Sequence, residues 1–182
     1  RRPAAQWTEA LPVGNGRLGA MVFGGIERER IQFNESTLWI GEPHDYSHPG
    51  AVQHLAAIRQ LLFEGKQKEA EELAMQEFMS VPLRQMPYQP FADVQLVFPG
   101  HEKVKDYRRE LNLDDAIAGV SYETDGVMFR REVFSSAPDQ VIVIRLTADQ
   151  PGELSFRATF ACSHTNSTLA VAGKNRLAIR GR

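Results

Sequence analysis

Apolar residues recur at every second position along much of this 182-residue sequence, a period that favours β-strands over helices. It predicts one strand over 92–98 and another over 154–162, because strand side chains point alternately to two faces. The apolar faces consist of Ala92, Val94, Leu96 and Phe98 in the first strand, and Leu154, Phe156, Ala158, Phe160 and Cys162 in the second. The run "QVIVIRLT" lacks this alternation and predicts a strand covered on both faces.

Turn residues join several of these strands into hairpins. In "LGAMVFGGIERERIQF" the pair Gly24-Gly25 separates two alternating runs and supplies the positive φ angles of a tight primed turn. Asp125-Gly126 in "YETDGVMF" predicts a second hairpin. The final "TLAVAGKNRLAIRGR" stops after the second strand of another hairpin, so we expect the natural polypeptide to continue past Arg182.

One segment has a different period. Between 51 and 79 the apolar residues recur at helical spacing, and Gly65 interrupts them, which predicts two short helices. Pro82, Pro87 and Pro90 then disfavour regular structure and predict a long ordered loop. The whole pattern indicates a mainly β fold, an antiparallel β-sandwich with a short inserted helical pair, in one domain over 1–182.

Charge and cysteine content argue against several functions. Lys and Arg total 21 against 23 Asp and Glu, and a net charge of -2 provides no basic field for a phosphate backbone. Cys162 is the only cysteine, so no disulfide forms within the chain. No apolar run approaches the roughly 18 residues that a membrane-spanning helix needs. We therefore expect neither nucleic-acid binding nor a membrane span.

The glycines of "GNGRLG" match a dinucleotide-binding motif. Gly14, Gly16 and Gly19 satisfy G-x-G-x-x-G, and Glu35 lies close to the position of the expected acidic partner. That motif must open a helix, whereas the following "AMVFGG" alternates like a strand. A glycine-rich entry to a strand is the better interpretation.

Two further patterns concern metals and glycans. His44, His48 and His54 suggest a metal site, but Pro43 and Pro49 bracket the first two histidines and favour a surface loop. Asn34-Glu35-Ser36 and Asn166-Ser167-Thr168 match the N-x-S/T glycan acceptor, whose meaning depends on the source of the protein.

Catalytic groups are not evident. No serine is flanked by nucleophile-elbow glycines, and Cys162 falls in the apolar register of its strand. Glycoside hydrolysis uses two carboxylates that meet in space from separate elements. The sequence offers Glu9, Glu27, Glu35 and Glu42 as candidates without pairing any of them.

The segment "FNESTLWIGEP" places Trp39 next to Asn34 and Glu35, a chemistry that suits sugars. An aromatic face stacks on C–H groups, while amides and carboxylates bond hydroxyls. Alternatively, Trp39 plugs the sandwich or docks another domain.

Three long blocks resemble the amino-terminal domain of glycoside hydrolase family 95, the inverting α-L-fucosidases. They are "WTEALPVGNGRLGAMVFGGIERERIQFNESTLWIGEP", "YQPFADVQLVFPGH" and "YRRELNLDDAIAGVSYETDGVMFRREVFSSAPDQVIVIRL", in the expected order. The resemblance implies a super-sandwich-like domain that packs on a downstream catalytic (α/α)6 barrel. It implies hydrolysis of terminal L-fucose from glycans with inversion, without a metal or other cofactor. The catalytic residues would all lie in the barrel, so none is expected here.

The resemblance also gives the segment around Trp39 a role. We expect Asn34, Glu35, Trp39, Asn15 and Arg17 to be domain-interface residues that face the barrel or reach the substrate rim. The expected partners are that barrel and a fucosylated glycan, and the family resemblance favours secretion or a periplasmic location. The competing hypothesis is a free-standing carbohydrate-binding or structural β-sandwich module.

Overall fold

A computed structural model describes residues 2–84 and 86–181. The chain divides into two compact units, which we describe separately. The first comprises Arg1–Leu38 and Gln89–Arg182, and the second comprises Trp39–Tyr88.

The first unit is a sandwich of two antiparallel sheets. One sheet has the strand order β1-β2-β3-β4-β9 and the other has the order β5-β6-β7-β8. A short 3-10 helix, Trp7–Glu9, precedes β1. The first sheet contains β1 (Leu11–Gly14), β2 (Leu18–Val22), β3 (Arg28–Glu35), β4 (Ala92–Val97) and β9 (Arg157–Ala161). The second sheet contains β5 (Lys105–Asn112), β6 (Ile117–Thr124), β7 (Val127–Ser136) and β8 (Val141–Ala148).

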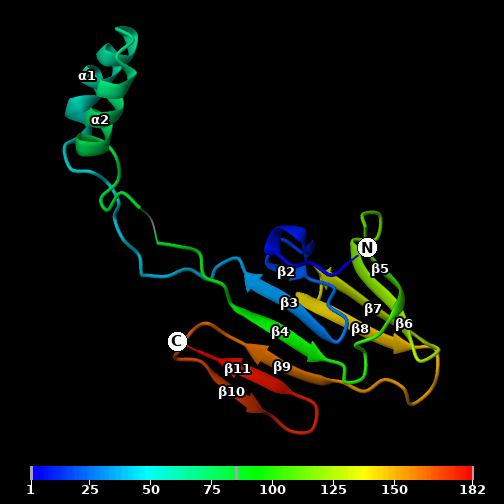
Figure 1. Ribbon diagram of the computed structural model, residues 1–182. Coiled ribbons are helices and arrows are strands. Elements are labelled where there is room, and N and C mark those ends of the chain that lie inside the picture. Colours follow the sequence, from blue (N-terminus) through cyan, green and yellow to red (C-terminus); the bar gives the residue numbers. More distant parts are fainter. Residues whose placement is uncertain (1, 85, 182) are drawn as a thin grey trace. The chain divides into compact units, whose positions relative to one another are not determined.

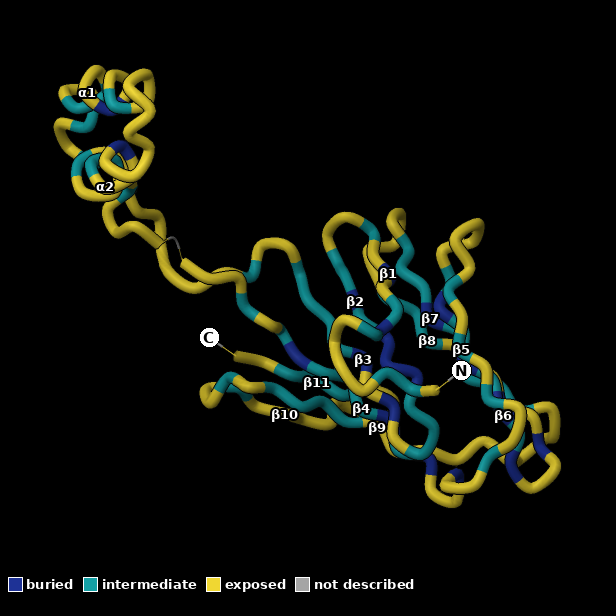
Figure 2. Tube along the Cα trace, turned by 45° about the horizontal axis from the view of Figure 1, so that its top comes forward, coloured by how far each residue is buried: buried dark blue, intermediate teal, exposed yellow. Residues whose placement is uncertain are grey.

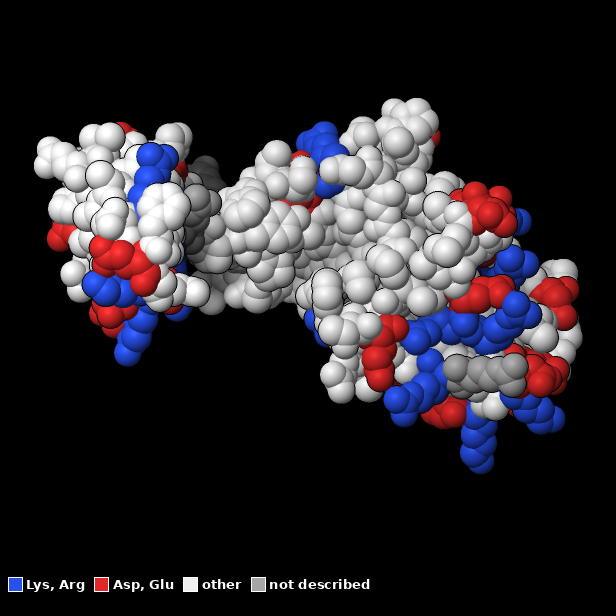
Figure 3. Space-filling view, turned by 90° about the horizontal axis from the view of Figure 1, so that it is seen from above, with Lys and Arg blue, Asp and Glu red and all other residues white. Residues whose placement is uncertain are grey.

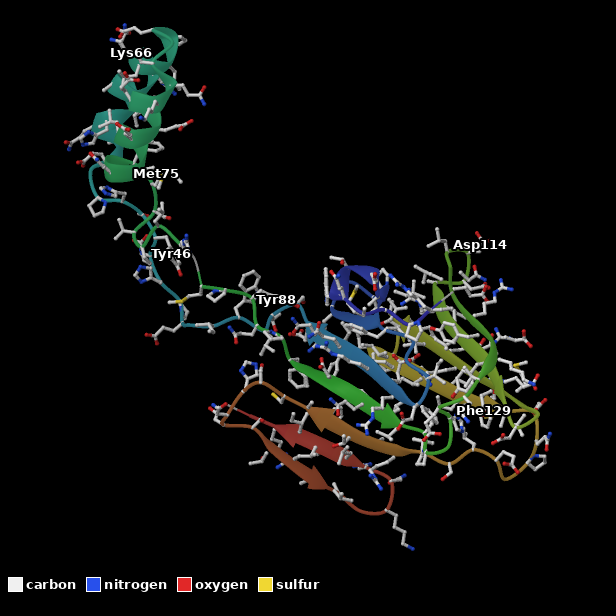
Figure 4. The ribbon with its side chains drawn as sticks, in the orientation of Figure 1. Tyr46, Lys66, Met75, Tyr88, Asp114 and Phe129 are labelled. Atoms are coloured by element: carbon white, nitrogen blue, oxygen red, sulfur yellow. The ribbon has the colours of Figure 1, made fainter. Side chains whose placement is uncertain are left out.

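The core of this unit lies between the two sheets, as Figures 1 and 2 show. Val22 and Ile31 of the first sheet pack in one cluster with Ala118 and Val133 of the second. Phe129, labelled in Figure 4, belongs to a neighbouring cluster with Tyr122 and Val120. The alternation in the sequence therefore corresponds to an inner and an outer face, and the predicted mainly β fold is confirmed.

The predicted hairpins differ in their turns. Asp125 and Gly126 have φ angles of 50° and 78°, and Thr124 pairs with Val127, so the primed two-residue turn is confirmed. The tight turn predicted at Gly24-Gly25 is wrong, because the last β2–β3 pair is Val22 with Ile31 and a longer loop joins the strands. This loop is held by Glu29, which accepts a hydrogen bond from the Gly24 N–H at 2.9 Å.

The strand predicted over 154–162 is shorter than expected. Strand β9 begins at Arg157, so Leu154 and Phe156 precede it. Phe156 is 44% exposed, although its ring contacts Phe98 at a centroid distance of 5.8 Å. The prediction that Phe156 lies on the inward face of a strand is therefore wrong.

Two other strand predictions have mixed outcomes. The run predicted to be covered on both faces is β8, an edge strand in which no residue is buried, so that prediction is wrong. The final hairpin is confirmed as β10 (Thr168–Val171) paired with β11 (Leu177–Arg180).

The second unit contains the helical pair. Helices α1 (Ala51–Phe63) and α2 (Gln67–Glu77) flank Gly65, whose φ of 75° ends the first helix, and the prediction is confirmed. Ile58 and Ala70 are the buried residues of the two helices. Met75 of α2, labelled in Figure 4, is exposed. The described part of the Pro-rich segment forms neither helix nor strand, apart from the bridge between Tyr88 and Trp39.

Candidate functional site

Four of the five predicted site residues lie at one end of the first sheet. Asn15 and Arg17 occupy the β1–β2 turn, and Asn34 and Glu35 end strand β3. The β2–β3 register places Leu18 opposite Glu35 and Gly19 opposite Asn34, which brings the turn beside the strand end. We call Asn15, Arg17, Asn34 and Glu35 the polar rim.

Several hydrogen bonds hold the carboxylate of Glu35 in the polar rim. Its carboxylate accepts hydrogen bonds from the Thr37 hydroxyl at 2.5 Å, the Thr37 N–H at 2.9 Å and the Arg17 Nε at 2.8 Å. The Thr37 hydroxyl and the Arg17 side chain lower the pKa of Glu35 to about 2. A general acid for glycoside hydrolysis needs a raised pKa. With its lowered pKa, Glu35 is ionised at neutral pH and does not suit the role of general acid.

The two asparagines stabilise the backbone around the polar rim. Asn15 Oδ1 accepts from the Leu18 N–H at 2.7 Å, and Asn15 Nδ2 donates to the Ser136 carbonyl at 2.8 Å. Because Ser136 ends β7, this second bond joins the two sheets. Asn34 Nδ2 donates to the Gln89 carbonyl at 2.6 Å. The polar rim is thus held in one geometry by its own hydrogen bonds.

Arg17 gives the polar rim an exposed cation. Its side chain retains 62% of its accessible surface, compared with 20% for its partner Glu35. Its backbone is fixed, because the Arg17 carbonyl accepts from the Ser36 N–H at 2.9 Å. The polar rim can therefore offer a positioned guanidinium to a partner surface or to a ligand.

Trp39 belongs to the second unit. It forms a bridge with Tyr88, and the two rings meet edge to face at a centroid distance of 5.1 Å. Trp39 is 56% exposed.

One hollow on the described surface of the sandwich is small for a ligand. A hollow of about 130 Å³ lies along β3 and β4 and is lined by residues that include Arg28, Arg30 and Gln95. Small-molecule sites usually enclose about 300 Å³ or more. Positive and negative side chains lie beside one another on this unit (Figure 3), as in the Arg30–Asp93 pair at 2.7 Å.

The other motifs have structural roles. Gly14 and Gly19 pair with each other in the β1–β2 hairpin, so the G-x-G-x-x-G glycines do not open a helix. Among residues 2–84 and 86–181, no group of three or more His, Cys, Asp or Glu side chains is placed to hold a metal ion. His44 instead contacts the Val81 carbonyl at 3.0 Å, and His54 lies 3.7 Å from Glu77.

Sequence reasoning missed a charged pair in the sandwich core. Glu29 of β3 and Arg131 of β7 form an ion pair across the two sheets, and both are buried. Burial raises the pKa of Glu29, and the neighbouring Arg131 opposes that effect. A signal was present, because Glu29 precedes Ile31 by two positions and therefore shares its inward face.

Comparison with known proteins gives one family match. A family model described as glycosyl hydrolase family 65, N-terminal domain, matches residues 1–182.

The described residues contain no helix long and apolar enough to cross a membrane.

Three curated relatives are named as fucosidases. "Alpha-L-fucosidase 2" of Arabidopsis thaliana is 40% identical over 98% of this chain and 21% of its own length. "Probable alpha-fucosidase A" of Aspergillus niger is 32% identical over 78% of this chain and 18% of its own length. The Aspergillus oryzae protein of the same name is 26% identical over 80% of this chain and 21% of its length. The chain thus spans about a fifth of the relatives it matches.

Proposed function

The chain belongs to the family of glycosyl hydrolase family 65 N-terminal domains, and from this premise we propose that it is the noncatalytic amino-terminal domain of an α-L-fucosidase-like glycoside hydrolase. In this proposal the remainder of a longer polypeptide, an (α/α)6 barrel, carries the acid and base. The parent would remove terminal L-fucose from glycans with inversion, as in glycoside hydrolase family 95.

The names and lengths of the relatives support the parent activity. All three are fucosidases by name, and in each the matched part is about a fifth of the protein. Four fifths of such a protein leaves ample length for a separate catalytic domain, since domains typically contain 50 to 250 residues.

The geometry of the polar rim supports docking, and the lowered pKa of Glu35 argues against a general-acid role for this residue. The carboxylate of Glu35 is bonded by Thr37 and Arg17, and its pKa lies far below that of a general acid. A rigid polar surface with one exposed guanidinium fits the modest, rather polar interfaces between domains of one chain. We therefore assign the polar rim to docking of the barrel.

A matched pair of arginines tests this assignment. Arg17 and Arg28 are both exposed and each lies beside a glutamate, but Arg28 begins β3 whereas Arg17 lies beside its end. In the full-length polypeptide, Arg17→Ala should lower the unfolding midpoint or fucoside turnover, and Arg28→Ala should change neither. In the isolated 182-residue chain, neither substitution should change the free energy of unfolding by more than about 0.5 kcal/mol, the usual effect of a surface substitution. Equal effects of the two substitutions in the full-length protein would show that the polar rim is not part of the interface with the barrel.

A further inference from the structure

The connection between β4 and β5 places a histidine in the core of the sandwich. Residues 98–104 cross from the first sheet to the second, since β4 ends at Val97 and β5 begins at Lys105. Phe98 is 2% exposed and His101 is 7% exposed, so two buried rings anchor this connection. An imidazole can change its charge in the physiological pH range, whereas a phenyl ring cannot.

Aromatic side chains surround the His101 imidazole. Its ring stacks on Phe98 at a centroid distance of 5.6 Å, and it lies 4.5 Å from the Phe129 ring and 5.6 Å from the Tyr122 ring. Its Nδ1 lies 2.9 Å from the Tyr122 hydroxyl oxygen. Because Tyr122 belongs to β6 and Phe129, labelled in Figure 4, belongs to β7, these contacts hold the connection on the second sheet.

Charged groups act on His101 from the elements around it. Arg131 of β7 lies 4.8 Å from the centre of the same Phe98 ring on which the imidazole stacks. Glu102, next in the chain, and Asp125 of the β6–β7 turn are both exposed. Burial and the Arg131 charge lower the pKa of His101, while the charges of Glu102 and Asp125 oppose this change. The folded connection therefore favours the neutral imidazole.

The other titratable groups of this core do not hold the connection by a change of charge. Burial raises the pKa of Tyr122, and it raises the pKa of Tyr107 on β5 to about 12, so both phenols stay neutral at physiological pH. Glu29 of β3 is bound to Arg131. That ion pair joins β3 to β7 and contains no residue of the 98–104 connection, so it can stay formed when the connection moves.

We propose that His101 is a pH-sensitive latch, whose protonation releases the 98–104 connection from the second sheet while the Glu29–Arg131 pair continues to hold the two sheets together. A protonated imidazole has no acceptor atom, so the Tyr122 hydroxyl can no longer donate to it. Protonation also places a second positive charge near Arg131, away from water. Release of the connection returns the new cation to solvent.

The direction of the pH effect follows from the shift. Since the pKa of His101 is lowered in the folded chain, the closed connection carries no penalty above the ordinary value of 6.5. Below that pH the released form binds a proton more readily than the closed form. The closed connection is therefore progressively destabilised as the pH falls below 6.5.

Amide hydrogen exchange of the 182-residue chain at pH 7.5 and pH 5, corrected for the intrinsic effect of pH on exchange, tests the latch. One probe is the Phe98 N–H, which donates to the Glu27 carbonyl at 2.8 Å. The second probe is the His101 N–H, which donates to the Phe98 carbonyl at 3.3 Å. The reference is the Phe23 N–H, which donates to the Arg30 carbonyl at 3.1 Å, outside the connection.

Protection of the two probes should fall by about threefold to thirtyfold at pH 5, because 1.5 pH units separate that pH from the ordinary imidazole pKa of 6.5. The Phe23 N–H should keep its protection. In His101→Gln, which keeps an acceptor for Tyr122 but cannot become charged, the difference between the two pH values should disappear.

Thr124→Val is the matched control. It removes the hydrogen bond from Thr124 Oγ1 to the Lys103 carbonyl, 2.9 Å long, which is another contact between the connection and β6. This variant should lower the protection of the probes by the same factor at both pH values and should keep the pH response.

Unchanged protection of the probes in the wild-type chain at pH 5 would overturn the proposal. An equal loss at Phe23 would overturn it too, because the whole sandwich would then be opening. A pH response that persists in His101→Gln would assign the effect to another group. If that variant does not fold, the imidazole NMR titration of the wild-type chain decides, since a His101 midpoint at or above 6.5 excludes the latch.

Discussion

Arg131 of β7 donates a hydrogen bond to Glu29 of β3, and this buried ion pair links the two sheets of the sandwich. The Arg131 guanidinium also donates to the Gly25 carbonyl at 3.0 Å and lies 4.8 Å from the centre of the Phe98 ring. The β2–β3 loop is therefore attached to the second sheet by a charged group inside the core. Arg109, which donates to the Phe23 carbonyl at 3.0 Å, and Tyr107, which donates to the Gly24 carbonyl at 2.7 Å, strengthen the attachment.

Removing one charge of this ion pair should lower the free energy of unfolding substantially. Glu29→Gln leaves Arg131 buried without a counter-charge, and loss of one partner of such a pair typically costs about 3–5 kcal/mol. Urea unfolding of the 182-residue chain measures this loss. Arg145→Ala, which removes an exposed partner of Glu132, is the control and should cost less than about 1 kcal/mol.

The double variant Glu29→Leu/Arg131→Met separates pairing from packing. Replacing both charges by apolar groups should restore most of the lost stability, because no buried charge is left unpaired. If the double variant is as unstable as Glu29→Gln, the pair stabilises the fold by its shape and not by mutual neutralisation.

Phe98 and Phe156 should contribute very different amounts to the free energy of unfolding. Phe98 is 2% exposed, so Phe98→Ala should cost about 3–5 kcal/mol. Phe156 lies outside β9 and is 44% exposed, so Phe156→Ala should cost clearly less. The comparison uses the midpoints of chemical unfolding of both variants. Equal losses of stability in the two variants would indicate that residues 154–156 continue strand β9 and that Phe156 packs in the core.

The contribution of Glu35 to stability should decrease as the pH falls. Its pKa is lowered from 4.5 to about 2, so its ionised contacts stabilise the fold above the ordinary value and are lost as pH falls toward 2. The wild-type chain should melt at a higher temperature than Glu35→Gln at pH 7, and the difference should shrink between pH 4.5 and pH 2. A difference that stays constant over this range would show that the charge of Glu35 is not responsible.

Trp39 should matter little to the isolated chain. It is 56% exposed and its ring contact is with Tyr88 of the same unit, so Trp39→Ala should leave the melting temperature of the sandwich nearly unchanged. In the full-length protein the same substitution should lower stability or turnover if Trp39 docks the barrel. Trp7→Ala, which removes a tryptophan of similar exposure (57%), is the control. A large loss in the isolated chain would instead identify Trp39 as a packing residue.

The sequence predicted most of the fold because two-residue alternation and turn chemistry act locally. Asp125-Gly126 shows this, since the pair supplies the two positive φ angles that its hairpin requires. Gly24-Gly25 shows the limit, because only Gly24 has a positive φ. Gly25 is needed for close packing instead, as a Cβ there would lie 1.8 Å from the Arg28 carbonyl oxygen. Contacts of this kind depend on the fold around the loop.

The candidate site was predictable in part for the same reason. Asn15 and Arg17 come close to Asn34 and Glu35 through the β2–β3 register, which alternation helps to fix. The bond from Asn15 to Ser136 spans 121 positions of sequence and joins two sheets, which no local pattern reveals. The Glu29–Arg131 pair was missed because a carboxylate within an alternating run reads as an outward residue until its register is counted.

Hydrolysis of an aryl α-L-fucoside by the 182-residue chain and by the full-length polypeptide tests the central claim most directly. The account predicts no turnover by the chain and clear turnover by the full-length protein, because the acid and base are assigned to the downstream barrel. Turnover by the purified chain that disappears on Glu35→Gln would contradict it and would place a catalytic carboxylate within the sandwich.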